Sequence, residues 1–335
     1  MDRKHLLKVT LAVAALIGAL GWASSDVRAQ GGKPLTLAFF VKNLSNPNWL
    51  AARIGAEKAA QELGVKLEHV APTKPDNIEE QTRLTEDRLV KKPDGFVFVP
   101  VDFKALIPSV QKAIDAGMPV ALYSNNMPDV RGVVTYVGSD DTTIEYEMSK
   151  FLFAKLGGKG KIVHIDGNPA AITAQQRKVG FERALKEYPN IELLGSQPGQ
   201  YRRLPAVQVF ENLMQRFPVI DGVVSANDDM AVGVVETLAA AGRAGKTLVV
   251  GVDVIPDAVA LIKEGKMFAS ADYSLHDQAY LATTALVKKL RGEKVPSRII
   301  LPVRIATQDN IAHWQSKMED RQTPKWADVV AAQKP

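Results

Sequence analysis

The sequence predicts an α/β fold with two parallel sheets, each covered by helices on both faces. Short apolar segments alternate strictly with segments of helical periodicity from Leu35 to Ile305. This alternation is typical of parallel sheets, whose strands are buried on both faces. One sheet of roughly ten strands would be wide for a twisted open sheet, so two sheets are expected. The pattern begins again at Asp140, which places the boundary between the two halves there.

The first strand and helix show how each element is predicted. The apolar run Leu35–Val41 predicts a buried strand, and the polar residues 42–46 predict a loop. Asn46 is a favourable N-cap. Pro47 fits the first helical position, where its missing N–H would have no partner. We therefore expect a helix that begins at Pro47.

The remaining elements follow in the same order along the chain. Further strands are expected at Val65–Ala71, Gly95–Val99, Pro119–Tyr123, Val133–Val137, Lys161–Ile165, Ile191–Ser196, Gly222–Ser225, Thr247–Val252, Met267–Tyr273 and Ile299–Ile305. Further helices are expected at Phe103–Ala116, Thr142–Leu156, Ala171–Glu187, Leu204–Phe217, Asp229–Ala241, Pro256–Lys263 and Asp277–Leu290. Asp76 is expected to cap a helix that ends at Lys92, and Asp102 to cap the helix 103–116.

Residues 1–29 have the features of a cleaved export signal. Three basic residues precede an apolar stretch from Val9 to Leu20, and Val27-Arg28-Ala29 has the small-x-small pattern of a signal-peptidase site. A membrane anchor is the alternative, but the stretch is short for a span of about 20 residues. We therefore expect export to the periplasm and cleavage after Ala29.

The composition excludes several classes of function. Without residues 1–29 the formal net charge falls from +5 to about +3, and basic residues are interspersed with acidic ones, unlike those of a nucleic-acid binder. The absence of cysteine excludes disulfides and thiolate chemistry, and no histidines have zinc-site spacing. Catalytic and phosphate-binding motifs are absent, and the adjacent carboxylates Asp140-Asp141 and Asp228-Asp229 point apart at helix starts. We therefore expect no catalytic residues, no cofactor and no metal.

Polar side chains gather where the predicted strands end. Ligands of parallel α/β sheets bind outside the carboxyl ends of the strands. The residues at these positions are Lys42, Asn43, Ser45, Asn46, Ser124, Asn125, Asn227, Asp228 and Asp253. Amide and carboxylate groups suit a ligand covered in hydroxyls, and Trp49 and Tyr201 offer apolar faces to its C–H side.

Several of these residues also have a purely structural interpretation. Asp102 and Asp228 can be helix caps, and Trp49 can belong to the core. Asn227 and Asp253 are stronger candidates, because each precedes its predicted helix by more than a cap position requires. Replacing either by Ala is expected to abolish binding and leave the melting temperature of the empty protein nearly unchanged.

A series of short motifs follows in a fixed order along the chain. They are Asn46-Pro47, Pro100-x-Asp102, Gly138-Ser139-Asp140, Arg177-Lys178-Val179-Gly180-Phe181, Ala226-Asn227-Asp228-Asp229-Met230-Ala231-x-Gly233 and Val250-Gly251-Val252-Asp253-x-x-Pro256-Asp257. Their order and spacing resemble periplasmic sugar-binding proteins of the ribose-binding type, the soluble receptors of ABC importers. The resemblance covers most of residues 35–305.

The resemblance implies the periplasmic binding protein type I fold, in which two lobes joined by three crossings close on a ligand by a hinge. The crossings are expected near Val134–Gly138, Tyr273–Leu275 and Leu301–Val303. The lobes would be residues 34–136 with 275–301, and residues 137–274 with 302–312. A tail, 313–335, would follow them.

The resemblance also implies which residues bind the ligand. They are Lys42, Asn46, Asn48, Trp49, Ser124, Asn125, Arg177, Tyr201, Asn227, Asp253 and Ser274. Arg177, which composition alone places on a solvated face, becomes a ligand-facing cation. Ser124-Asn125 replaces the Asp-Arg pair of ribose-type receptors, and neutral hydrogen bonds are roughly half as strong as charge-assisted ones. Lys42 and Asn48 also depart from the usual residues, which argues against ribose as the ligand.

These observations predict a monomer that captures a small sugar or polyol between two lobes and delivers it to the membrane permease of an ABC importer. A sensory role, in which the bound ligand is presented to a membrane receptor or histidine kinase, is the alternative. A periplasmic hydrolase would need a nucleophile–base pair or metal set that the sequence lacks. A transcription factor of the lactose-repressor type would carry a helix-turn-helix in place of the leader.

Overall fold

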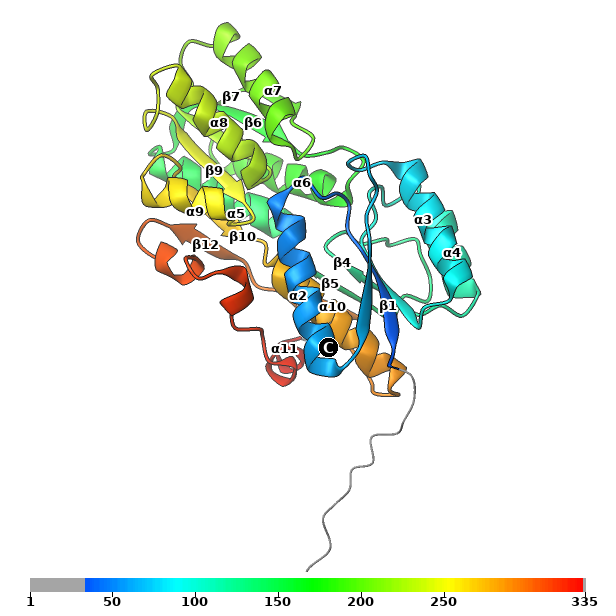
Figure 1. Cartoon of the computed structure of the whole chain (residues 1–335). Helices are drawn as coiled ribbons and strands as arrows, with labels where there is room; N and C mark the ends of the chain where they lie inside the picture. Colours follow the sequence, from blue (N-terminus) through cyan, green and yellow to red (C-terminus); the bar gives the residue numbers. More distant parts are fainter. Residues whose placement is uncertain (1–33, 334–335) are drawn as a thin grey trace, which may run out of the picture. The chain divides into compact units, whose positions relative to one another are not determined.

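Two six-stranded sheets organise residues 34–333, the part of the chain that the computed structural model describes (Figure 1). The predicted leader and its cleavage site after Ala29 lie outside these residues. No helix within residues 34–333 combines the length and the hydrophobicity needed to cross a bilayer. The prediction of an α/β fold with two separate sheets is confirmed.

The first sheet has the strand order β11-β5-β4-β3-β1-β2, and all its neighbouring strands are parallel. Its strands are β1 (Thr36–Phe40), β2 (Lys66–Val70), β3 (Gly95–Phe98), β4 (Val120–Tyr123), β5 (Thr135–Ser139) and β11 (Arg298–Leu301). Its helices are α2 (Pro47–Leu63), α3 (Ile78–Lys91), α4 (Ile107–Asp115) and α10 (Leu275–Leu290). Helices α2 and α10 pack together against one face of this sheet, and α3 and α4 pack together against the other (Figure 1).

The second sheet has the order β12-β10-β9-β8-β6-β7, in which only β12 is antiparallel to its neighbour among the described strands. Its strands are β6 (Lys159–Asp166), β7 (Asn190–Pro198), β8 (Gly222–Ser225), β9 (Leu248–Val252), β10 (Ala269–Asp272) and β12 (Arg304–Thr307). Its helices are α5 (Asp141–Lys155), α6 (Ile172–Glu187), α7 (Arg203–Arg216), α8 (Asp228–Ala240) and α9 (Pro256–Lys263). Helix α5 packs with α6, and α8 packs with α7 and α9.

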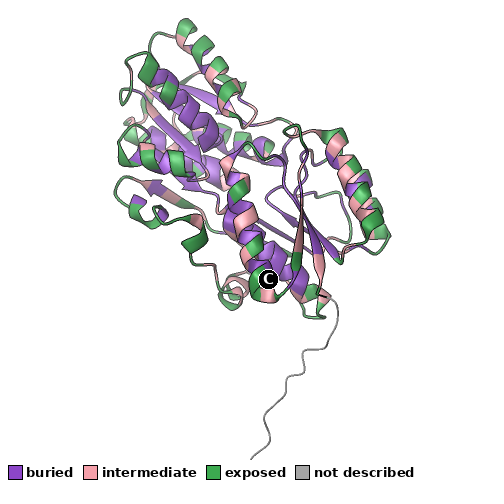
Figure 2. Ribbon diagram, viewed as in Figure 1, coloured by how far each residue is buried: buried purple, intermediate pink, exposed green. Residues whose placement is uncertain are grey.

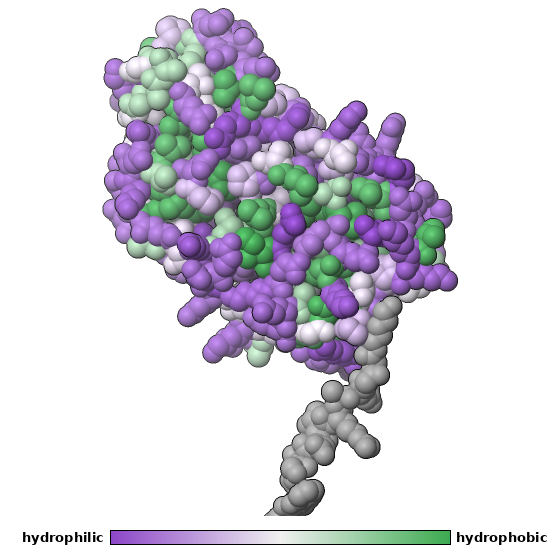
Figure 3. Space-filling view, viewed as in Figure 1, coloured by the Kyte–Doolittle hydropathy of each residue, from purple (hydrophilic) through white to green (hydrophobic). Residues whose placement is uncertain are grey.

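The inner strands β1, β3, β4, β5, β8, β9 and β10 are buried on both faces, as their apolar sequences predict, whereas the edge strands β2, β7 and β12 are mostly half-buried or exposed (Figure 2). In β1, Leu37 and Phe39 belong to one hydrophobic cluster while Ala38 and Phe40 belong to another, because successive side chains point to opposite faces. The face in Figure 3 is mostly hydrophilic, with hydrophobic residues in small patches. Burial of apolar strands therefore provides the main stabilisation of both sheets.

The chain passes between the sheets at three points before its C-terminal segment. The passages follow β5 at Ser139, β10 at Asp272 and β11 at Leu301. The last passage corrects one prediction, because Ile299–Ile305 is not a single strand. It is divided between β11 and β12 around Pro302, which cannot donate a ladder hydrogen bond.

Two predicted helix caps are wrong. Helix α4 begins at Ile107, and the Asp102 carboxylate accepts hydrogen bonds from the amides of Lys104 and Ala105, both at 2.8 Å. Asp102 thus caps a separate turn ahead of the helix. The cap of α3 is Asn77, whose Oδ1 accepts from the Glu80 amide at 2.7 Å. Asp76 is left available to face Asn43 instead.

The C-terminal segment, residues 308–333, contacts elements of both sheets. It contains the short 3₁₀ helices η1 (Ile311–Trp314) and η2 (Met318–Asp320) and the helix α11 (Trp326–Ala332). Trp314 lies in the hydrophobic core beside the second sheet, and its indole donates to Asp272 at 2.9 Å. On the side of the first sheet, Lys58 of α2 donates to the Arg321 carbonyl at 2.7 Å, and the Ile300 amide of β11 donates to Gln333 at 2.9 Å.

Candidate functional site

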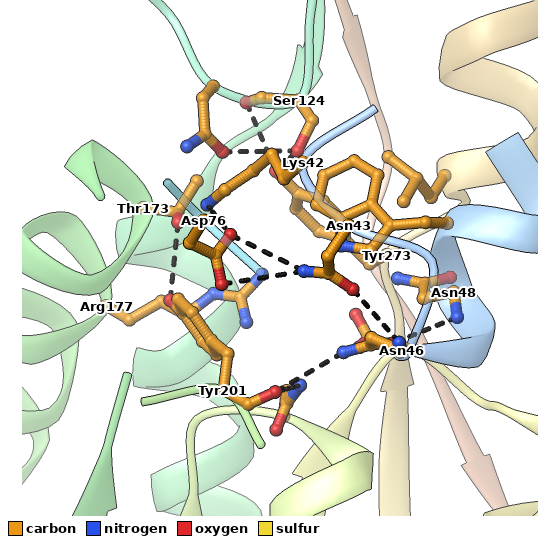
Figure 4. Close-up of a pocket in the computed structure, with 15 residues that line it drawn as sticks. Lys42, Asn43, Asn46, Asn48, Asp76, Ser124, Thr173, Arg177, Tyr201 and Tyr273 are labelled. Carbon is orange, nitrogen blue, oxygen red and sulfur yellow. Dashed lines mark hydrogen bonds and ion pairs between the residues drawn. The ribbon is translucent and has the colours of Figure 1, made fainter. Parts of the chain in front are cut away.

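A cavity lies at the carboxyl ends of strands from both sheets (Figure 4). It contains about 470 Å³ of empty space, including the part open to solvent. The residues that line it are Lys42, Asn43, Asn46, Asn48, Trp49, Asp76, Ser124, Asn125, Thr173, Arg177, Tyr201, Asn227, Asp253, Tyr273 and Leu275. The structure therefore brings together every predicted ligand-binding residue except Ser274.

The loop after β1 is organised by Asn43. Its side-chain oxygen accepts hydrogen bonds from the amides of Ser45 at 3.2 Å and Asn46 at 3.0 Å. Asn46 is the N-cap of α2, as predicted, because its Oδ1 accepts from the Asn48 amide at 2.9 Å. The Asn46 Nδ2 lies 3.4 Å from the carbonyl oxygen of Tyr201, which precedes α7 of the second sheet. This contact joins the two sides of the cavity.

Lys42 places a positive charge between two aromatic rings. Its Nζ lies 5.9 Å from the ring centroid of Trp49 and 6.0 Å from that of Tyr201, within the range of cation–π attraction. Burial lowers the pKa of Lys42, and the nearby carboxylate of Asp76, at 3.9 Å, opposes that change. The ammonium group has three donors, so Lys42 can donate to ligand hydroxyls.

Ser124 and Asn125 follow β4 and provide neutral groups. Ser124 has a positive φ of 60°, and its hydroxyl lies 3.3 Å from the hydroxyl of Tyr273. The Asn125 Nδ2 donates to the Pro100 carbonyl at 3.2 Å. Both side chains are buried, and their hydrogen bonds fix them before any ligand arrives.

Arg177 is held in place by a buried ion pair. Its Nε donates to the Asp141 Oδ1 at 2.8 Å, and its Nη1 donates to the Ala226 carbonyl. The guanidinium faces the rings of Tyr273 at 4.8 Å and Tyr201 at 5.7 Å. Burial raises the pKa of Asp141 to about 6, although Arg177 opposes the rise. Arg177 lines the cavity, and its remaining N–H groups can donate to a ligand bound there.

Asn227 and Asp253 differ from each other more than the sequence suggests. Asn227 is itself the N-cap of α8, with its Oδ1 accepting from the Met230 amide at 3.1 Å, so the expectation that it lies beyond the cap position is wrong. Its Nδ2 lies 3.4 Å from the Tyr201 carbonyl oxygen. Asp253 follows β9, and its carboxylate makes no hydrogen bond to another residue within 34–333. Burial raises the pKa of Asp253 well above its usual range, and Arg177 opposes the rise.

Ser274 is not part of this cavity. It has a positive φ of 54° at the start of α10 and lines a separate hollow beside Asp272, Arg304 and Trp314. Tyr273, its neighbour, lines the cavity instead. Strand β10 ends at Asp272 rather than at Tyr273, so Tyr273 rather than Ser274 is the first residue after the strand.

Sequence reasoning missed four lining residues: Asp76, Thr173, Tyr273 and Leu275. Asp76 follows β2 and Tyr273 follows β10, so the rule that ligands bind at strand ends could have found both. Thr173 lies four positions before Arg177 in α6 and therefore on the same helical face. No motif in the sequence points to Leu275.

The cavity combines neutral amides, hydroxyls, aromatic faces and charged groups that are mostly paired. Lys42 faces Asp76 and Arg177 is bonded to Asp141, whereas Asp253 has no ion-pair partner within residues 34–333. The same residues contain no cluster of three His, Asp or Glu side chains arranged to hold a metal ion. The arrangement can therefore exchange many directional hydrogen bonds with an uncharged polar molecule.

Comparisons with known proteins identify the family of this chain. The model of the periplasmic binding protein domain matches residues 37–294. The D-allose-binding periplasmic protein of Escherichia coli K12 is 31% identical over 264 residues, which are 77% of this chain and 84% of that protein. The ribose import binding protein RbsB of Bacillus subtilis is 28% identical over 302 residues, which are 90% and 96% of the two chains.

The solved structures give the same result. A periplasmic solute-binding protein from Actinobacillus succinogenes with bound D-allose has a TM-score of 0.79 and 32% identity, covering 84% of this chain and 99% of that one. The resemblance inferred from the sequence motifs is therefore confirmed. The chain belongs to the periplasmic binding protein family, has its type I fold, and is similar to its ribose-type members, which bind substrates and are not enzymes.

Proposed function

We propose that the mature protein binds one molecule of a neutral sugar or polyol in this cavity and delivers it to the permease of an ABC importer. The observation that carries the proposal is the pairing of charges around the site. The buried cations Lys42 and Arg177 each face a carboxylate, that of Asp76 and that of Asp141. Asp253 adds a further carboxyl group, whose oxygens accept no hydrogen bond from residues 34–333 and can accept them from a ligand. This arrangement favours hydroxyl groups and disfavours sugar phosphates and sugar acids.

The relatives support a monosaccharide. The Escherichia coli relative is named for D-allose, and the Actinobacillus succinogenes protein was solved with D-allose bound. Trp49 and Tyr201 supply faces for the apolar side of a sugar ring, and Asn46, Asn125 and Asn227 supply amides for its edge. D-Allose is therefore the first sugar to test.

The ligand would bridge groups that follow both sheets. Asn46 and Trp49 follow β1 of the first sheet, whereas Arg177 and Asp253 come from elements of the second. A ligand that touches both sets has more contacts when the lobes are closed than when they are open, so it favours closure. The lobes predicted from the sequence are residues 34–136 with 275–301 and residues 137–274 with 302–312. Because β5 ends at Ser139, we propose that residues 137–139 belong to the first lobe instead. The mature protein would act as a monomer.

Thermal unfolding of residues 30–335 with a panel of sugars and polyols tests the proposal. A ligand at about 1,000 times its Kd stabilises the folded state by about 4 kcal/mol. That should raise the melting temperature by roughly 6 °C. The panel is D-allose, D-ribose, D-glucose, D-galactose, L-arabinose, xylitol and glycerol, with glucose 6-phosphate and gluconate as charged controls. A shift with a charged control alone, or with nothing on the panel, would contradict the proposal.

Delivery to a permease needs a separate measurement. Uptake of the sugar that binds is compared between cells with and without the gene. Loss of uptake at low sugar concentration is expected. Unchanged uptake together with a lost transcriptional or chemotactic response to that sugar would favour the sensory role instead.

A further inference from the structure

The turn that carries Asp253 has an unusual backbone. Asp253 and Val254 have positive φ angles of 124° and 53°. Few residues other than glycine adopt this region, and β-branched residues such as Val254 do so least readily. Such a conformation persists only where its surroundings hold it. Contacts with neighbouring residues must therefore hold this turn.

Three successive amides of the turn are each hydrogen-bonded. The Asp253 amide donates to the Ala271 carbonyl of β10 at 2.8 Å. The Val254 amide donates to the Ser270 hydroxyl oxygen at 3.1 Å. The Ile255 amide donates to the Oδ2 of Asp228 at 3.1 Å. Two of the three acceptors are thus side chains, and both lie outside the cavity.

Those two side chains are themselves bonded to each other. The Ser270 hydroxyl lies 2.8 Å from both carboxylate oxygens of Asp228 and donates to them. Both residues are fully buried, with 0% of their surface exposed. The Ser270 hydroxyl therefore accepts from the turn and donates to Asp228, so that the carboxylate orients it.

Asp228 is a buried carboxylate that is not paired with a cation in the described part of the chain. No ion pair joins it to a Lys, Arg or His side chain within residues 34–333. A buried carboxylate without a cation is costly unless hydrogen bonds compensate it, and its bonds go to Ser270 and to the turn. Gly251 leaves room for the Asp228 carboxylate, because a Cβ atom added at Gly251 would collide with the Asp228 Oδ1.

We infer that Asp228, acting through Ser270 and the Ile255 amide, is a positioning residue that holds the 253–255 turn so that the Asp253 carboxylate faces the ligand cavity. Asp228 does not line the cavity. The inference rests on the proposed function of the cavity. A simpler role exists, in which Asp228 only stabilises the first turn of α8 through the helix dipole. The two roles predict different results for Ser270, which is not in α8.

The first measurement is hydrogen exchange of the ligand-free mature protein, which needs no sugar. Ser270→Ala and Asp228→Asn are expected to accelerate exchange of the Val254 and Ile255 amides at least tenfold. The amides in the middle of α8 and β9 should keep their wild-type rates. Unchanged exchange at the turn in both variants would overturn the inference. If Asp228→Asn does not fold, Ser270→Ala alone decides the result.

The second measurement is calorimetric titration with D-allose. Ser270→Ala and Asp228→Asn are expected to raise its Kd at least tenfold. The matched control is Thr237→Val, which removes a buried hydroxyl of α8 bonded to the Gly233 carbonyl at 2.8 Å, away from the turn. Its Kd should stay within twofold of wild type. Normal binding by Ser270→Ala and Asp228→Asn would overturn the inference.

A double-mutant cycle separates action through Asp253 from any other route. In an Asp253→Asn background, adding Ser270→Ala should change the Kd less than twofold, with titration extended to millimolar sugar. An equal loss in both backgrounds would show that Ser270 acts elsewhere. Failure of the wild type to bind D-allose would count against this sugar as the ligand, and hydrogen exchange would still decide whether Asp228 holds the turn.

Discussion

Removing the charge of Arg177 provides the sharpest test of the site's electrostatics. In Arg177→Met, Asp141 loses the cation that lies 2.8 Å from its Oδ1, and the Ala226 carbonyl loses its guanidinium donor. Asp141 is 1% exposed, and of its side-chain partners only the Tyr273 hydroxyl remains, at 3.3 Å. The variant therefore leaves an uncompensated carboxylate inside the protein.

The size of the effect follows from that burial. Breaking a buried ion pair by removing one partner costs about 3–5 kcal/mol. Asp141 already has its pKa raised by burial to about 6 in the presence of Arg177, and without Arg177 the pKa rises further. At pH 7.5 the folded variant must therefore either keep an unpaired charge or bind a proton, and both are unfavourable. We expect a loss of about 3–5 kcal/mol in the free energy of unfolding at pH 7.5.

The direction of the pH dependence is fixed by the same argument. A carboxyl group with a raised pKa in the folded state destabilises that state as the pH rises. The penalty specific to Arg177→Met should therefore be smaller at pH 5.5, where Asp141 is protonated in wild type and variant alike. Urea unfolding of the ligand-free proteins, followed by tryptophan fluorescence, measures the free energy at both pH values.

A second substitution separates the charge from the lost packing. Asp141→Asn removes the carboxylate, so the double variant Arg177→Met/Asp141→Asn should recover more than half of the loss at pH 7.5. If the double variant is no more stable than the single one, or if the loss is the same at both pH values, Asp141 is not the source of the instability. Neither outcome is compatible with the geometry described.

Two further predictions concern the second sheet. Asn227→Ala should weaken sugar binding and also lower the free energy of unfolding by about 1 kcal/mol, because it removes the cap of α8. Asn227→Ser should restore the free energy of unfolding, measured with urea, but not the affinity, measured by titration with the sugar. Burial raises the pKa of Asp228 to about 7, so the folded protein binds this proton more tightly than the unfolded chain. The contribution of Asp228 to stability should fall as the pH rises from about 4 to about 7, and Asp228→Asn should remove that contribution from the pH dependence of ligand-free melts between pH 5 and 8. Identical slopes would contradict the assignment.

The buried strands and the general place of the site could be predicted from sequence, because both depend on local patterns. A run such as Leu35–Val41 has few alternatives to a buried strand, and the carboxyl ends of such strands are where polar side chains can meet. Asn46 and Pro47 define a helix start through their own chemistry. These signals need no knowledge of distant residues.

Long-range partners could not be predicted in this way. Asp140 and Asp141 are adjacent, yet Asp140 caps α5 while Asp141 is buried against Arg177, 36 residues away. The sequence predicts that the helix after Asn227 starts at Asp229, whereas α8 starts one residue earlier, at Asp228. The sequence therefore places Asn227 outside the cap position that it occupies. This error also hid the expected cost in stability of Asn227→Ala. Which of two adjacent residues caps a helix and which forms a buried ion pair depends on contacts with residues that are distant in the sequence.

The C-terminal segment has a consequence for how strongly the protein holds its ligand. It begins beyond the residues matched by the family model, which end at 294, and adds a fourth connection between the sheets, which is covalent only at β12 and reaches the first sheet through hydrogen bonds. Any separation of the two halves must stretch this tether or break its bonds, such as those of Lys58 to Arg321 and Trp314 to Asp272. These hydrogen bonds, which lie outside the cavity, therefore add to the free-energy cost of such a separation. Natural selection could therefore adjust affinity here without altering any side chain that meets the sugar.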